Sequence, residues 1–275
     1  YMDIKAFKMD GLGNDFVIID QRIHNLNLSK DQIIKICDRD FIGCDQLILI
    51  KKNSEIDAGL EFYNSDGSIS GACGNGTRCI ADFLSKEGNK KEISLLTSSG
   101  LLKSKILGNN LVETEIGIPK INWEEIPLSK KIDTKDLKIE IIDKDNNKHI
   151  GGIAINVGNP HIIFFVNDIE SFDLKKIGPK IENHKLFPDK CNVTLAKVIN
   201  KNLVKVKVWE RGAGLTKACG TAACATAVAG NIKTLIDKTT DIEFALGKLT
   251  ISIDKKNSVH MKGPVSDIKN IDIKL

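Results

Sequence analysis

The chain repeats itself across its length, and this repeat constrains the fold more than any other feature of the sequence. Aligning the chain with itself at a shift of 145 to 146 residues brings four anchors into register in the same order. Shared turn chemistry can explain any one match, but four at nearly one offset indicate two copies of one unit. The anchors of the two copies are Gly13-Asn14 and Gly158-Asn159, Gln46 and Asn192, Tyr63 and Trp209, and Ala-Cys-Gly at 72–74 and 218–220.

The pattern of apolar residues predicts many short strands and few helices. Strand runs follow one another more often than they alternate with helices, which favours an α+β fold with mostly antiparallel strands. Segment 117–131, with two prolines and no clean period, is the expected linker between the copies. We expect strands at 16–20, 46–50, 59–63, 92–96, 153–157, 161–166, 203–209, 249–253 and 259–262, and helices at 29–39, 75–86 and 220–236, the last two buried.

Composition excludes several classes of function. The 40 Lys and Arg residues are interspersed with 36 Asp and Glu residues, so we expect no nucleic-acid partner. No apolar run approaches transmembrane length and the first residues do not resemble a signal peptide, so we expect a cytoplasmic protein without a membrane partner. The seven cysteines include no C-x-x-C pair, which disfavours both a disulfide scaffold and a metal site.

Each Ala-Cys-Gly precedes a helix of small residues, which places Cys73 and Cys219 at helix N-termini. Free backbone N–H groups and the helix dipole favour an anion there, so a carboxylate can bind and a thiol can ionise. Two such cysteines, facing each other across a cleft, could remove a Cα proton from one face and return a proton to the other. The alternative is that both cysteines are buried packing residues, as we expect for Cys37, Cys44, Cys79, Cys191 and Cys224.

Four sequence blocks resemble the diaminopimelate epimerase family: GLGNDF at 11–16, CGNGTRC at 73–79, GNPH at 158–161, and ERGAG with ACGTAA between 210 and 223. The resemblance spans nearly the whole chain. It implies a cofactor-independent epimerase that interconverts LL- and meso-2,6-diaminopimelate, a step of lysine and peptidoglycan precursor biosynthesis. It also implies two pseudosymmetric α/β domains, 1–118 with 264–275 and 119–263, with the active site in the cleft between them. A homodimer is expected by resemblance alone.

The resemblance also assigns roles to residues. Cys73 becomes the proton donor and Cys219 the acceptor, while His161 and Glu210 position or tune the catalytic groups. Amide side chains and a guanidinium suit a substrate with an ammonium and a carboxylate at each end. The positions that match substrate-binding residues are Asn14, Gln46, Asn64, Asn159, Asn192, Glu210 and Arg211, together with the backbone donors at Gly74, Asn75, Gly220 and Thr221.

Several of these residues also have a purely structural interpretation, and the chain has alternative functions. Asn14 could be a turn residue, Arg211 a surface charge and His161 a strand-edge histidine. The sequence departs from the family pattern at Cys44, Cys191 and Leu215, but no proposed catalytic group is lost. The alternatives are a proline or hydroxyproline racemase of the same fold, a thiol-based redox or metal-binding protein, and an inactive binding module.

Overall fold

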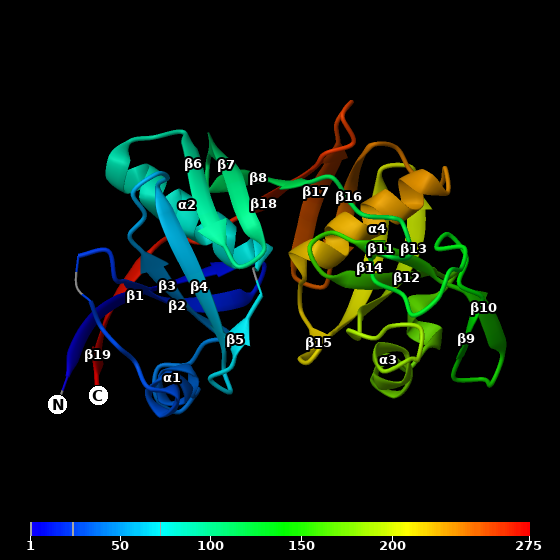
Figure 1. Ribbon diagram of the computed structural model, residues 1–275, viewed down its shortest axis with the longest axis horizontal. Helices are drawn as coiled ribbons and strands as arrows, with labels where there is room; N and C mark the ends of the chain where they lie inside the picture. Colours follow the sequence, from blue (N-terminus) through cyan, green and yellow to red (C-terminus); the bar gives the residue numbers. More distant parts are fainter. Residues whose placement is uncertain (1, 24, 72) are drawn as a thin grey trace. The chain divides into compact units, whose positions relative to one another are not determined.

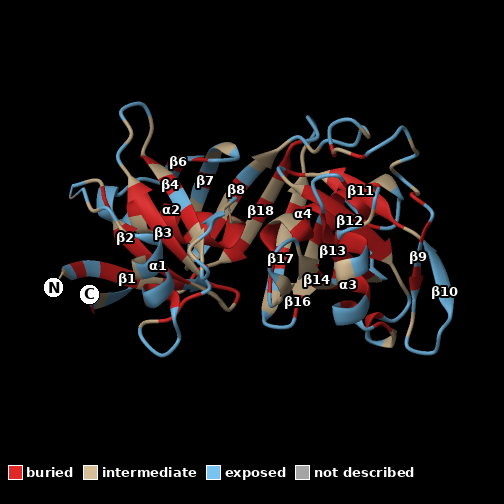
Figure 2. Cartoon of the chain, turned by 60° about the horizontal axis from the view of Figure 1, so that its bottom comes forward, coloured by how far each residue is buried: buried red, intermediate tan, exposed pale blue. Residues whose placement is uncertain are grey.

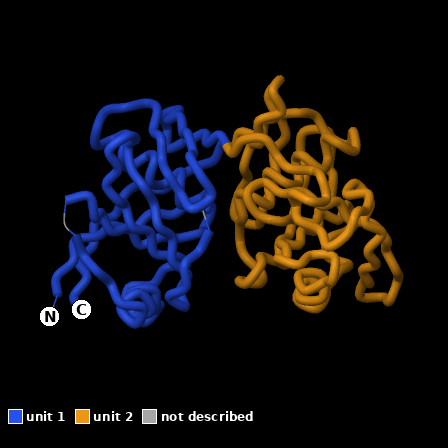
Figure 3. The backbone as a smooth tube through the Cα atoms, in the orientation of Figure 1, with its two compact units in different colours: residues 1–115, 262–275 blue, residues 116–261 orange. Residues whose placement is uncertain are grey.

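The computed structural model describes residues 2–23, 25–71 and 73–275. Ala72, the first residue of the N-terminal Ala-Cys-Gly, lies outside the described residues. The chain forms two compact units, which Figure 3 distinguishes by colour. Unit 1 comprises Tyr1–Glu115 with Lys262–Leu275, and unit 2 comprises Ile116–Met261.

Unit 1 is built on a mixed sheet in which most neighbouring strands run antiparallel. The strands follow the order β19-β1-β2-β3-β4-β6-β7-β8, and only the β2–β3 and β4–β6 pairs are parallel. The short strand β5 pairs with β4. The elements are β1 (Asp3–Gly11), β2 (Asn14–Asp20), α1 (Lys30–Cys37), β3 (Gln46–Lys51), β4 (Ala58–Asn64), β5 (Ile69–Ser70), α2 (Gly74–Gly88), β6 (Glu92–Thr97), β7 (Gly100–Gly108), β8 (Leu111–Gly117) and β19 (Lys269–Lys274).

Unit 2 repeats this plan. Its strands follow the order β11-β12-β13-β14-β16-β17, and again only two pairs, β12–β13 and β14–β16, are parallel. The elements are β9 (Ile139–Ile142), β10 (Lys148–Gly151), β11 (Ile153–Asn156), β12 (Pro160–Phe165), η1 (Ile169–Ser171), α3 (Leu174–Glu182), β13 (Asn192–Asn200), β14 (Leu203–Glu210), β15 (Gly214–Thr216), α4 (Gly220–Ile232), β16 (Thr239–Phe244) and β17 (Gly247–Ile253); β18 (Val259–Pro264) leads back to unit 1.

The order of strand directions is the same in the two units, which confirms the predicted repeat. β2, β3, β4 and β6 correspond to β12, β13, β14 and β16, including both parallel pairs. The helices also correspond, because α2 lies between β5 and β6 and α4 lies between β15 and β16. The similarity is therefore one of topology as well as of sequence, and the expected α+β class is confirmed.

One helix lies among the strands of each unit and packs against several of them (Figure 1). α2 contacts β1, β2, β6 and β7, and α4 contacts β11, β12, β13, β16 and β17. The burial colours of Figure 2 mark both helices as largely buried. Because α4 consists mainly of Ala, Thr, Cys and Gly, the surrounding strands can approach it closely from several sides.

All nine predicted strands and all three predicted helices overlap observed elements, but other strands, among them β1, β7, β13 and β16, were not predicted. α4 ends at Ile232 rather than at residue 236, and Thr234 has a left-handed backbone (φ 57°) that ends the helical path. α3 was not predicted, because the Gly178-Pro179 pair inside it is typical of a helix break. Among the described residues, no helix has the length and apolar composition that crossing a bilayer requires.

Candidate active site

Cys73 is the N-cap residue of α2 and has an extended backbone (φ −110°, ψ 119°). Its carbonyl oxygen accepts the first helical hydrogen bond, from Thr77 N at 2.9 Å, and a second from the Thr77 hydroxyl at 2.8 Å. The Cys73 side chain does not cap the helix, and the first turn of α2 contains no acidic residue. The thiol therefore lies at a helix start whose N–H groups and positive dipole end favour an anion.

Cys219 has the equivalent position as the N-cap residue of α4, again with an extended backbone (φ −143°, ψ 111°). Its Sγ accepts a hydrogen bond from Ala222 N at 3.4 Å and lies 3.5 Å from Thr221 Oγ1. Burial raises the pKa of this thiol, and the negative charge of Glu210 raises it further. Cys219 is therefore held as the neutral thiol, although the helix start alone would favour the thiolate.

Three predicted residues of unit 1 occupy strand ends at one edge of its sheet. Asn14 begins β2, Gln46 begins β3 and Asn64 ends β4. Because β2 and β3 are parallel and β4 runs antiparallel to β3, these ends coincide at one edge. Gln46 Nε2 donates to Asn64 Oδ1 at 3.1 Å and to Ser70 Oγ at 2.9 Å. We call Asn14, Gln46, Asn64, Cys73 and Asn75 the unit 1 cluster.

The corresponding strand ends of unit 2 also carry predicted residues. Asn159 directly precedes β12, Asn192 begins β13 and Glu210 ends β14, which makes Glu210 the counterpart of Asn64. The same topology thus supplies an amide in unit 1 and a carboxylate in unit 2 at one position. We call Asn159, His161, Asn192, Glu210, Arg211, Cys219 and Thr221 the unit 2 cluster.

His161 is fully buried within the unit 2 cluster. Its Nε2 lies 2.8 Å from Asn159 Oδ1 and 3.1 Å from Thr221 Oγ1. Burial, with a smaller effect from the positive charge of Arg211, lowers the pKa of His161 to about 3. The imidazole is therefore neutral at physiological pH, and because an amide oxygen only accepts, Nε2 carries the ring proton.

Asn192 and Arg211 fasten the loop that follows β14. Asn192 is buried; its Nδ2 donates to Pro160 O at 3.0 Å and its Oδ1 accepts from Arg211 N at 2.8 Å. The Arg211 guanidinium donates from Nη1 to Asp189 O at 3.0 Å. Asn192 thus ties β12, β13 and the loop together through backbone groups, in addition to any contact with a ligand.

Sequence reasoning missed two supporting residues in unit 2. The buried carboxylate of Glu182, at the end of α3, accepts hydrogen bonds from Trp209 Nε1 at 2.8 Å and from Gly212 N at 3.0 Å. Gly178, one turn earlier, packs against the Trp209 ring. No signal in the sequence marked either residue, because α3 itself was not predicted.

The other five cysteines are packing residues, as expected from the sequence. Cys37, Cys44, Cys79, Cys191 and Cys224 are all buried and reduced. Cys44 lies 3.5 Å from Cys37, measured between the Sγ atoms, in the core beneath α1. Burial raises the pKa of Cys79 and of Cys191, which makes both thiols poor nucleophiles.

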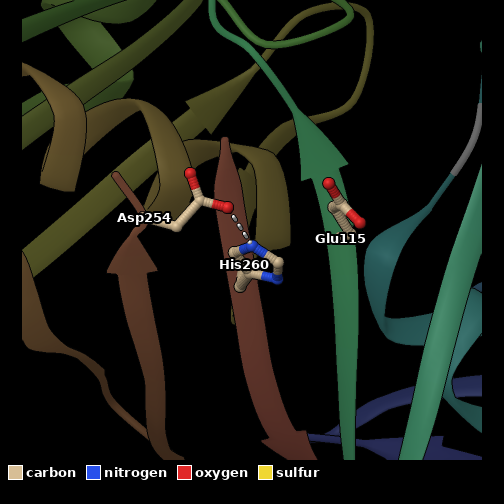
Figure 4. A group of neighbouring side chains, drawn as sticks. All are labelled: Glu115, Asp254 and His260. Atoms are coloured by element: carbon tan, nitrogen blue, oxygen red, sulfur yellow. Dashed lines mark hydrogen bonds and ion pairs between the residues drawn. The ribbon is translucent and has the colours of Figure 1, made fainter. Parts of the chain in front are cut away.

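A polar pair outside these clusters has a structural role. His260 Nε2 and Asp254 Oδ2 are 2.9 Å apart in unit 2 (Figure 4). The Asp254 carboxylate also accepts from Lys256 N and Ser258 N, and these bonds form the turn between β17 and β18. The hydrogen bonds to His260 and to these backbone groups also lower the pKa of Asp254.

Comparison with known proteins identifies the relatives of the chain. A sequence model described as diaminopimelate epimerase matches residues 6–121 and 153–268. A protein of Pelagibacter ubique, named diaminopimelate epimerase, is 84% identical over 274 residues and covers 100% of both chains. A protein of the same name from Acidiphilium cryptum is 41% identical over 260 residues, covering 94% of this chain and 92% of the relative.

Solved structures of lower sequence identity share the fold. A hydroxyproline epimerase from Agrobacterium vitis matches with a TM-score of 0.69 at 12% identity, covering 100% of this chain and 92% of that one. A probable proline racemase from Agrobacterium radiobacter matches with a TM-score of 0.70 at 11% identity, covering 99% and 93%. At these identities the likeness concerns the fold alone.

Proposed function

The chain belongs to the diaminopimelate epimerase family, and from this membership we infer that it interconverts LL- and meso-2,6-diaminopimelate in lysine biosynthesis. The observation that carries the inference is the pair of N-cap cysteines, Cys73 and Cys219, at equivalent places in two copies of one unit. Each supplies a thiol beside a helix start, and the family match spans both copies.

The proposed reaction uses the two thiols on opposite faces of one carbon atom. One cysteine, as thiolate, removes the proton from the substrate Cα, and the other, as thiol, gives a proton to the opposite face. The two cysteines exchange their protonation states in each turnover, so the reverse reaction uses the same pair. No cofactor enters the scheme, and it requires Cys73 and Cys219 to reach the same Cα.

The helix starts favour this chemistry because negative charge develops on the substrate carboxylate as the proton leaves. Backbone N–H groups at Gly74 and Asn75 and at Gly220 and Thr221 can donate to that carboxylate. Such preorganised donors supply a large part of the acceleration in carbanion chemistry, because they need not reorganise as the charge forms.

The electrostatics of the unit 2 cluster favour one distribution of the two roles. His161 is neutral and the pKa of Cys219 is raised, so the unit 2 cluster holds Cys219 as the proton donor in the resting state. Cys73 would then be the thiolate that removes the first proton. This assignment is the reverse of the donor and acceptor roles expected from the resemblance.

The remaining polar residues would recognise the two ends of the substrate. Diaminopimelate has an ammonium and a carboxylate at each end, so it needs donors and acceptors at both. Amide side chains such as Asn14, Gln46 and Asn64 supply both kinds of group, while Arg211 can pair with a carboxylate. The enzyme is also proposed to be cytoplasmic and to act as a homodimer; sedimentation of the purified chain would test the dimer.

The test is to incubate the reduced protein with LL-diaminopimelate in D2O. We expect the meso isomer to form, with deuterium at the inverted Cα. Proline and hydroxyproline serve as parallel substrates, because the fold is shared with enzymes named for them. Absence of both isomerisation and labelling would contradict the proposed function, and turnover of proline instead would replace it with a racemase.

A further inference from the structure

Arg78 of α2 is fully buried, which is rare for an arginine. It lies one turn after Asn75, and helical side chains lean toward the N-terminus of their helix. The guanidinium therefore turns back to the first turn, where Nη2 donates to Asn75 Oδ1 at 2.5 Å. A buried positive charge thus contacts Asn75, a residue of the unit 1 cluster.

This hydrogen bond fixes the orientation of the Asn75 amide. Because a guanidinium only donates, the carbonyl oxygen of Asn75 must face it, and the NH2 group must face the other way. Asn75 is 1% exposed, yet its Nδ2 has no hydrogen-bond partner in the described part of the chain. A buried donor without a partner is costly, so the observation points to a partner that arrives with a ligand.

Arg78 and Asn75 also lie close to the GLGNDF motif of unit 1. A Cβ at Gly11 would lie 3.4 Å from Arg78 Nη2 and 3.4 Å from Asn75 Cβ. Gly11 is paired with Asn14 across the β1–β2 hairpin. The missing side chain at residue 11 therefore lets the hairpin that carries Asn14 lie directly against this pair, so that GLGNDF and CGNGTRC meet there.

The equivalent position in unit 2 is occupied differently. The shift of 146 residues places Thr221 opposite Asn75 and the buried Cys224 opposite Arg78. Thr221 is held by the neutral His161 at 3.1 Å instead of by a cation. In both units, the residue two positions after the cysteine is polar and is held by a hydrogen bond from a buried side chain. That side chain is an arginine in unit 1 and a neutral histidine in unit 2.

We propose that Arg78 is a positioning residue: it turns the Asn75 amide so that Nδ2 donates a hydrogen bond to a carboxylate of the substrate. This donor adds to the backbone N–H groups of the helix start. The inference rests on the proposed function, since it specifies how the unit 1 cluster holds the anionic group. Asn75 contacts the substrate in this scheme, and Arg78 acts only through Asn75.

The first test is Asn75→Asp, which keeps an oxygen for Arg78 and replaces the NH2 group by an oxygen of the same size. We expect kcat/KM for LL-diaminopimelate to fall by about 100-fold or more, because a donor to the carboxylate becomes a repelling acceptor. The thermal unfolding temperature should stay near that of the wild type. A folded variant with kcat/KM within about threefold of the wild type would overturn the proposal.

The second test is a double-mutant cycle of Asn75→Ala and Arg78→Met, which remains informative if the aspartate variant does not fold. Arg78→Met alone should lower kcat/KM by about tenfold or more, and Arg78→Lys should recover part of the loss because lysine can still donate. In the Asn75→Ala background, the same Arg78→Met change should cost less than about threefold. Equal losses in both backgrounds would show that Arg78 does not act through Asn75.

The control separates this inference from the proposed function. Arg22→Lys changes a partly buried arginine of unit 1 that pairs with Asp20 and Glu87, away from the cluster. The wild type and this control should both epimerise diaminopimelate at similar rates. If neither does so, the proposed function fails and the inference falls with it, whereas selective loss at residues 75 and 78 supports both.

Discussion

Gly178 on α3 packs against Trp209 on β14 so closely that a Cβ at residue 178 would lie 2.5 Å from Trp209 Cγ. The indole N–H of Trp209 donates to Glu182, which also holds Gly212 N. α3 therefore fixes the strand end that carries Glu210 and the loop that carries Arg211. A helix that carries neither Cys73 nor Cys219 thus helps to determine where two proposed substrate-binding residues lie.

Gly178→Ala should displace the Trp209 ring, because the indole and the helix backbone leave no room for a methyl group. We expect a loss of about 1–3 kcal/mol in the free energy of unfolding, measured with urea. The KM for diaminopimelate should rise as the loop after Glu210 shifts. Gly151→Ala is the matched control, since a Cβ there meets nothing within 4 Å. Unchanged stability in the Gly178 variant would contradict the packing argument.

Gly76→Ala tests another close approach, in α2 of unit 1. A Cβ at residue 76 would lie 2.8 Å from Ile48 Cδ1 and 2.9 Å from Phe62 Cε1, both in the core. We expect about 1–3 kcal/mol of destabilisation from overpacking, although alanine favours helix formation. In the control, Gly88→Ala near the end of the same helix, the nearest contact is 3.8 Å and the substitution should be neutral or stabilising. Similar unfolding midpoints for the two variants would refute the prediction.

The repeat made the fold largely predictable from the sequence. The Ala-Cys-Gly pair located both central helices, and the pattern of apolar residues located some of the strands that surround them but missed β1, β7, β13 and β16. The pairing could not be predicted, because parallel β2–β3 and β4–β6 contacts join strands that are separated in the chain. α3 was not predicted for a related reason. The Gly178-Pro179 pair would weaken this helix in isolation, and packing against Trp209 stabilises it in the folded chain.

The cysteines of the candidate site were predictable, but their surroundings were only partly so. Cys73 and Cys219 stand directly before recognisable helices, so local sequence was enough to predict N-cap positions. The hydrogen bonds of Asn192 to Pro160 and Arg211 depend on β12 and β13 lying side by side. Arg78 was part of a recognised motif, yet its role depends on burial, which the sequence around an arginine does not reveal.

Glu210→Gln should lower the pKa of Cys219, because the carboxylate charge and its hydrogen bond both favour the neutral thiol. We expect the pH at which iodoacetamide alkylation of Cys219 reaches half its maximal rate to fall. Peptide mass spectrometry follows this cysteine separately from the others. Glu243→Gln, which removes a surface partner of Lys205 in the same unit, should leave the midpoint unchanged. An upward shift in the Glu210 variant would reverse the assigned effect.

His161 should make the protein less stable in mild acid. Its pKa is about 3 in the folded chain, whereas an unperturbed histidine has a pKa of 6.5, so between these limits the unfolded chain binds a proton that the folded chain does not. Its contribution to stability is therefore full above pH 6.5 and declines as the pH falls, by about 1 kcal/mol for each pH unit. Urea unfolding between pH 7 and 5 should show a smaller decline for His161→Gln than for the wild type.

The control for this prediction is His184→Gln. His184 is less buried, and burial with the charge of Lys185 also lowers its pKa, so its substitution should remove a smaller part of the decline. The two variants thus compare how strongly the folded chain lowers the pKa of each histidine. An equal pH dependence in the wild type and in His161→Gln would show that His161 is not held neutral in the folded chain.

Single alanine substitutions of the two cysteines should separate the two half-reactions. Each of Cys73→Ala and Cys219→Ala removes the acid or base on one face, so epimerisation should fall by about 100-fold to 10,000-fold. The remaining cysteine can still exchange the Cα proton on its own face whenever it is ionised. In D2O, one variant should therefore label LL-diaminopimelate and the other the meso isomer, each without inversion. Circular dichroism checks that both variants are folded, and a folded single variant that epimerises at the wild-type rate would exclude a two-base reaction.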